Sequence, residues 1–200
     1  VGMYCASSCP MLILKWTHIE FAGFAITDAQ GQSVAQKSGT AFSILFQNPN
    51  GIFVMEDSWL YGGVDDPIRI FNGKICFMRN TFEKGGLHGG DCLNCKGGTV
   101  GDMAYNLFVG MATNGQKASN KGQPTGAAQT NIRMWNNTFI ADGYRQIQVG
   151  RGGDIDFEEG AKGMAYNNLV VNCKFGIRIV SNPAADTANI QYGYNYSYGD

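Results

Sequence analysis

An acidic and a basic residue enclose a short apolar segment near the middle of the chain. Asp91 and Lys96 stand at the two ends of "DCLNCK". A lysine can act as a general base when burial or neighbouring charges lower its pKa, and clustered carboxylates are the oxygen ligands that calcium prefers. Asp65 and Asp66 precede the similar segment "PIRIF", so they either complete a carboxylate cluster with Asp91 or form a turn.

Four short segments alternate apolar and polar residues, which predicts strands with one buried face. They are "PIRIF" (67–71), "CLNCK" (92–96), "QIQVG" (146–150) and "GIRIV" (176–180). Alternation predicts that Arg69, Asn94, Gln148 and Arg178 point outward, and Asn94 and Gln148 are candidates for substrate contacts. Together with Lys96, the two arginines either form a cationic stripe that binds an acidic glycan or are isolated surface charges.

Three further residues are candidates for the same site. His88 lies in the Gly-rich segment 83–91 and is a candidate for acid–base chemistry, with structural hydrogen bonding as the alternative. Arg133 and Trp135 point outward from another predicted strand. A Trp beside an Arg can stack on a sugar ring, or it can cover the edge of the strand.

Two polar stretches, 112–129 and 150–163, are predicted loops, because neither carries an apolar column in the expected places. Asp154, Asp156 and Glu158 alternate within the second stretch. They either share one side of an extended segment and hold calcium, or form an acidic solubilising loop.

The elements that must position these residues belong to a repeat. Six polar residues recur at intervals of 23, 26, 31, 31 and 27 residues: Asp57, Asn80, Asn106, Asn137, Asn168 and Asn195. Apolar or small residues recur three and five positions before each of them, which predicts a strand that ends in a turn. Apolar residues also recur two positions after the first five: Trp59, Phe82, Phe108, Phe139 and Val170.

Short strands, a repeat of about 22–31 residues and the lack of any helix-period segment predict an all-β parallel solenoid of about six to seven coils. Stacked coils would place the asparagines in an internal ladder and the aromatic residues in a stacked column. On these motifs the sequence, over residues 12–198, resembles the right-handed parallel β-helix proteins of the pectate-lyase-like superfamily.

This resemblance implies a carbohydrate-active protein, and specifically a polysaccharide lyase that cleaves uronate-containing glycans by β-elimination. The segment "DCLNCK" is similar to the acidic-four residues-Lys motif of the alginate-lyase and chondroitinase-B group, and to the "DGxxxK" motif of one pectate-lyase family. It implies that Lys96 is the base and that Asp91, with Asp65 or Asp66, holds calcium. The Arg-His-Gly strand expected about one coil after Lys96 is absent.

The alternative is a non-catalytic secreted or surface β-helix that binds glycan or serves as a structural spacer or adhesin. Two features separate these hypotheses, namely a base with a lowered pKa and a carboxylate cluster within its reach. The resemblance also implies an extracytoplasmic location.

Composition limits the other classes of function. The 200 residues are 44% hydrophobic and 16% charged and include 28 glycines, which fits one β-helix domain over 1–200; we expect a fragment that lacks one or both caps. A net charge of −1 and the lack of a Lys/Arg run argue against a nucleic-acid partner. The apolar run "MLIL" is far too short for a transmembrane segment.

Overall fold

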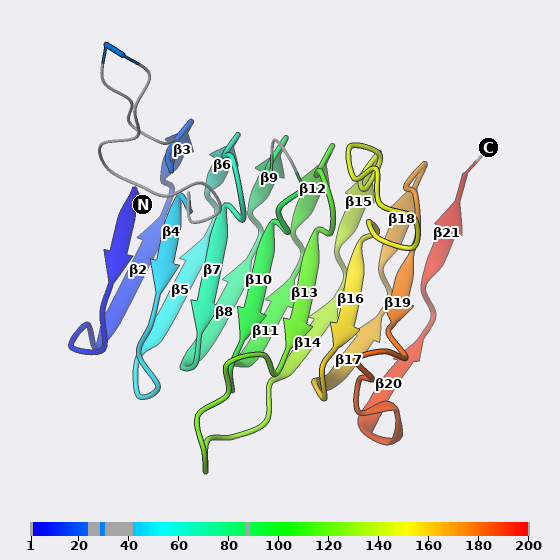
Figure 1. Cartoon of the computed structure of the whole chain (residues 1–200). Coiled ribbons are helices and arrows are strands. Elements are labelled where there is room, and N and C mark those ends of the chain that lie inside the picture. The colour runs from blue at the N-terminus through cyan, green and yellow to red at the C-terminus, as the bar shows by residue number, and fades with distance from the viewer. Residues whose placement is uncertain (1, 24–28, 31–41, 87–88, 200) are drawn as a thin grey trace.

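The computed structural model describes residues 2–23, 29–30, 42–86 and 89–199. It consists of three parallel seven-stranded sheets, and successive strands of the chain pass from one sheet to the next. Figure 1 shows the resulting coils stacked along one axis, from blue near the N-terminus to red near the C-terminus. The prediction of a parallel β-helix is therefore confirmed, with seven coils.

Each sheet takes one strand from every coil. The first sheet contains β1 (Met3–Cys5), β4 (Ile44–Phe46), β7 (Ile68–Phe71), β10 (Leu93–Lys96), β13 (Gln116–Ser119), β16 (Ile155–Glu158) and β19 (Ile177–Ile179). The second contains β2 (Met11–Lys15), β5 (Ile52–Glu56), β8 (Lys74–Met78), β11 (Val100–Ala104), β14 (Asn131–Trp135), β17 (Lys162–Tyr166) and β20 (Ile190–Gly193). The third contains β3 (His18–Glu20), β6 (Trp59–Tyr61), β9 (Thr81–Glu83), β12 (Leu107–Val109), β15 (Thr138–Ile140), β18 (Leu169–Val171) and β21 (Tyr196–Tyr198). One 3₁₀ turn, Thr187–Asn189, precedes β20.

The core is a set of apolar columns inside the coils, because alternate residues of every strand point inward. In the third sheet the Phe108 ring stacks between those of Phe82 and Phe139, with centroid distances of 5.0 and 4.8 Å. All three rings are fully buried. The predicted aromatic column is present here, and its burial contributes about 1.5–3 kcal/mol for each ring.

An asparagine ladder runs along the turn between the second and third sheets. The Asn137 amide donates to the Met103 carbonyl oxygen and to Asn168 Oδ1, both at 3.0 Å, and Asn137 Oδ1 accepts from the backbone and side chain of Asn106. The same pattern links Asn80 to Asn106 and Asn168 to Asn195. The predicted internal ladder is therefore confirmed.

The prediction that Asp57 is the first member of this ladder is wrong by one residue. Ser58 occupies the ladder position and donates its backbone N–H to Asn80 Oδ1 at 3.1 Å. Asp57 instead takes a left-handed backbone conformation in the turn, and its carboxylate pairs with Arg79. The same shift affects the apolar column. Leu60 is buried there in place of the predicted Trp59, which is exposed.

Three local predictions of secondary structure were wrong. One predicted strand is a loop, and two predicted loops each contain a strand. The segment 146–150 lies in the loop between β15 and β16, where Ile147 and Val149 are 95% and 94% exposed. Strands β13 and β16 instead lie within the predicted loops 112–129 and 150–163. Strand β13 reads "QKAS", which has no apolar alternation, so periodicity could not identify it.

Within the described ranges, no helix is long and apolar enough to cross a membrane.

Candidate functional site

The outer face of the first sheet carries a row of charged and amide side chains. Backbone pairing aligns Arg69, Asn94, Lys117, Asp156 and Arg178 on five adjacent strands. The prediction that Arg69, Asn94 and Arg178 share an outward row is confirmed. The prediction for Gln148 is wrong, because Gln148 lies in the loop between β15 and β16 and Asp156 takes its place in the row.

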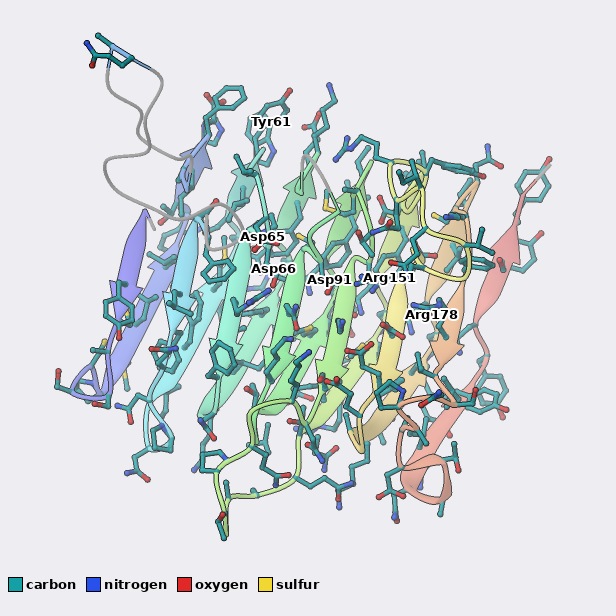
Figure 2. The ribbon with its side chains drawn as sticks, in the orientation of Figure 1. Tyr61, Asp65, Asp66, Asp91, Arg151 and Arg178 are labelled. Carbon is teal, nitrogen blue, oxygen red and sulfur yellow. The ribbon has the colours of Figure 1, made fainter. Side chains whose placement is uncertain are left out.

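Asp66 and Asp91 lie at the starts of neighbouring strands and are joined directly. Asp66 Oδ1 accepts the Asp91 backbone N–H at 2.8 Å, while Asp66 Oδ2 accepts from Arg69 Nε at 2.6 Å and from Asn94 Nδ2 at 2.8 Å. Burial and the Asp91 charge together raise the pKa of Asp66 to about 6, against the opposing effect of Arg69. Figure 2 shows Asp65, Asp66 and Asp91 gathered over adjacent strands.

Lys117 on β13 connects this carboxylate pair to the next coil. Its amine lies 2.7 Å from Glu158 Oε1 and 3.2 Å from Asp91 Oδ2. Burial alone would lower the pKa of the Lys117 amine, but the two carboxylates outweigh burial and raise it. Asn114 donates to Asp91 Oδ1 at 2.7 Å. Lys117 therefore stays charged and neutralises the C-terminal side of the cluster.

Lys96 differs from the other cations of this face. Its side chain is largely buried at 8% exposure, and within the described part of the chain no carboxylate oxygen lies within 4.0 Å of its amine. Burial lowers the pKa of Lys96, and the positive charges of Lys117 and Arg69 lower it further, while Asp66 and Asp91 oppose the shift. Lys96 is thus a lysine that releases its proton more readily than an ordinary one.

These groups surround a polar cavity of about 350 Å³. Its cationic lining residues are Arg69, Lys96, Lys117, Lys121 and Arg151. Its acidic lining residues are Asp65, Asp66, Asp91 and Glu158. With Lys96 protonated, five positive charges line the cavity against four negative ones, and with Lys96 neutral the two signs balance.

Six of the predicted site residues meet at this cavity, whereas Gln148, as described above, and three others do not. Arg178 lies further along the sheet, beyond Arg151 in Figure 2, and pairs with Asp156 at 3.3 Å. Arg133 and Trp135 lie on the second sheet, where Arg133 pairs with Asp102. The predicted role of His88 falls outside the described residues.

The sequence prediction missed Lys117, Asn114 and Arg151, and it placed Glu158 in an acidic loop and not at this cavity. A signal existed for Lys117, because it follows Asn94 by 23 residues and Asn94 follows Arg69 by 25, both within the repeat interval. The predicted loops containing Asp156 and Glu158 are also corrected, since both residues belong to β16 and Asp156 is buried. Burial raises the pKa of Asp156 to about 7 in spite of Arg178 and Lys117.

The carboxylates of this face, as arranged, do not fit a calcium site. Calcium needs six to eight oxygen ligands that turn toward one point. Both oxygens of Asp66 and of Asp91 instead accept hydrogen bonds or ion pairs from Arg69, Asn94, Asn114 and Lys117 or from the backbone. Calcium would have to displace Arg69 or Lys117, so no chemical step is assigned to it, and its predicted use stays a prediction.

Comparison of the chain with protein-family models, with curated proteins and with solved structures finds no match in any of the three. The fold is that of a parallel β-helix, and the likeness to the pectate-lyase-like superfamily stays a prediction from the sequence motifs.

Proposed function

We propose that the chain binds an acidic polysaccharide on the outer face of the first sheet and cleaves it by β-elimination, with Lys96 as the general base. The observation that carries this proposal is the state of Lys96. The Lys96 side chain is largely buried, its amine has a lowered pKa, and it lies among the cations and carboxylates of a single cavity. Elimination at neutral or mildly alkaline pH requires a base of this kind.

The charge and size of the cavity support a small acidic ligand segment. A volume of about 350 Å³ falls within the range of about 300–1,000 Å³ that is usual for ligand sites. Arg151 and Lys121 line the cavity in addition to the paired Arg69 and Lys117. These groups supply positive charge for the carboxylates of a uronate chain.

In the proposed reaction the neutral Lys96 amine takes the C5 proton, which lies next to the uronate carboxylate. The developing negative charge spreads onto that carboxylate, where Arg69 and Arg151 stabilise it. The C4–O bond then breaks with its electron pair on the leaving oxygen, and a C4=C5 double bond forms. The leaving oxygen takes a proton from the Lys96 ammonium group or from water, which balances the step.

A second candidate function is glycan binding without cleavage, and exposed aromatic side chains on the first two coils favour it. Trp16 is 80% exposed, and the His18 and Trp59 rings stack at 4.2 Å beside it. Exposed indole rings provide flat apolar faces on which sugar rings can stack. Such a surface needs no base, so this candidate does not depend on Lys96.

The test is ultraviolet absorbance of the unsaturated product during incubation with alginate, pectate and chondroitin, each with calcium and with a chelator. We expect a rise that Lys96→Met abolishes and that Lys74→Met, at an exposed position of the second sheet, leaves intact. Circular dichroism of each variant checks the fold. Absence of a rise on every substrate, with the folded chain still retarded in gels that contain the glycan, would replace the lyase proposal with the binding candidate.

A further inference from the structure

Two carboxylates and a thiol converge at the ends of the loop between β15 and β16. Asp142 begins this loop, Asp154 ends it directly before β16, and Cys173 follows β18 in the next coil. Figure 1 shows the loop crossing from the third sheet to the first. One ligand atom from each of the three residues lies within 4.8 Å of the other two.

The carboxylates are buried without the partners that buried carboxylates normally have. Asp142 and Asp154 both have 0% exposure. Asp142 Oδ1 accepts the Met111 backbone N–H at 2.6 Å, but within the described ranges Asp142 Oδ2 and both oxygens of Asp154 accept no hydrogen bond of ordinary geometry. Buried polar atoms without partners are rare and unfavourable, and the neighbouring Cys173 thiol offsets the burial of Asp154 only in part, so each of the two carboxyl groups requires a proton or a cation.

The thiol completes a set of three donors. Cys173 Sγ accepts the Asp142 backbone N–H at 3.4 Å and lies 3.3 Å from the Val171 carbonyl oxygen. These contacts hold the sulfur beside the carboxylates. Burial raises the pKa of Asp154 to about 9 and that of Asp142 to about 7.

We propose that Asp142, Asp154 and Cys173 form a binding site for one divalent transition-metal ion of the zinc type. Two carboxylate oxygens and one thiolate are ligands that zinc uses, and a thiolate disfavours calcium and magnesium. Binding would release the protons of the three groups to solvent. A water molecule would complete a four-coordinate site.

The charge balance supports a divalent ion. Two carboxylates and a thiolate carry three negative charges, and a divalent ion leaves one of them. Arg145 neutralises the remaining negative charge. Its positive charge acts on Asp142, and its guanidinium donates to the Gly85 carbonyl oxygen at 2.9 Å. The buried cluster would therefore become neutral on binding the metal.

A metal at this position would join both ends of the loop to the following coil. The loop carries Arg151, which lines the cavity on the first sheet. The metal would thus have a structural role that does not depend on whether the cavity performs catalysis.

The experiment titrates the full chain, stripped of metal and carrying no histidine tag, with Co²⁺ and then displaces Co²⁺ with Zn²⁺. We expect one ion per chain, a thiolate-to-cobalt charge-transfer band in the near ultraviolet, and d–d bands of the intensity typical of four-coordinate cobalt. We also expect Cys173→Ser to lose the charge-transfer band and Asp154→Asn to weaken binding at least tenfold. Cys76→Ser, at a half-buried thiol on β8, should retain both properties.

Asp154→Asn should fold, because an amide closely matches the shape of the protonated carboxyl group it replaces, and circular dichroism checks this. A wild-type melting temperature that rises with Zn²⁺, together with no rise in either site variant, supports the proposal. Binding of less than one ion per chain, or binding that is unchanged in folded Asp154→Asn and Cys173→Ser, would overturn it. A charge-transfer band that disappears in Cys76→Ser instead would assign the metal to another thiol and would also overturn it.

Discussion

Replacing Lys117 with methionine tests whether the polar row on the first sheet is a buried network or a solvated surface. The side chain of Lys117 is 5% exposed and bridges Asp91 and Glu158 at 3.2 and 2.7 Å. Methionine keeps most of the volume but removes the charge, which leaves two carboxylates without their cation. Breaking a buried ion pair in this way costs about 3–5 kcal/mol of the free energy of unfolding. Because Glu158 is 18% exposed and water can partly solvate it, we expect a value near the lower end of that range.

Arg133→Met is the matched control, because Arg133 occupies an outward position of the second sheet and pairs with Asp102. That pair is exposed, at 54% and 28%, so its loss should cost about 0.2–1 kcal/mol. The assay is urea denaturation followed by circular dichroism, with midpoints and slopes compared among the variants. Glu158→Gln should recover part of the stability in the Lys117→Met background, since it removes one of the two unpaired charges. Equal losses below about 1 kcal/mol in Lys117→Met and Arg133→Met would refute the assignment of a buried network.

Three further predictions concern the ladder, the core and the base. Asn137→Ala should lower the free energy of unfolding by about 3 kcal/mol, because it removes five hydrogen bonds from buried groups. Asn195→Ala, at the half-buried end of the ladder, should cost clearly less in the same urea assay. Gly101→Ala should prevent native folding, as judged by loss of a cooperative melting transition, because the new Cβ would lie 2.1 Å from a β8 carbonyl oxygen at a φ of +147°. If the proposed elimination is correct, kcat/KM should rise with pH as Lys96 loses its proton, with a midpoint below the ordinary lysine value of about 10.4. Lys117→Met should move that midpoint to higher pH, since it removes a like charge that favours the neutral amine; a shift to lower pH would contradict the assigned cause.

The repeating part of the fold could be predicted from the sequence because it follows from local rules. Alternation determines which face of a strand is buried, and the recurring asparagine marks the turn at which coils stack. The prediction was wrong by one residue at Asp57, because Ser58 occupies the ladder position in the turn between β5 and β6. Both residues are polar, and only the left-handed conformation of Asp57 in the stacked coil separates them.

Two segments had outcomes opposite to those that their periodicity predicts. The segment 146–150 alternates as well as any strand, yet it is a loop, while "QKAS" forms β13 without alternation. A strand in the middle of a solenoid gains backbone hydrogen bonds from both neighbouring coils, and these can outweigh a weak local pattern. Loop lengths between coils vary, so only stacking shows which segment reaches the sheet.

The sequence by itself determined the parallel β-helix, its apolar columns, its asparagine ladder and the outward direction of Arg69, Asn94 and Arg178. The sequence also predicted that Asp91 and Lys96 belong to one site, because they stand at the two ends of one strand segment. Only the tertiary structure decided which charges pair, since Lys117 reaches Asp91 from the next coil and Glu158 reaches Lys117 from the coil after that. The lowered pKa of Lys96 and the convergence of Asp142, Asp154 and Cys173 depend on the same stacking. Burial and electrostatic interaction are properties of positions in space, and sequence spacing specifies those positions only where coil lengths are known.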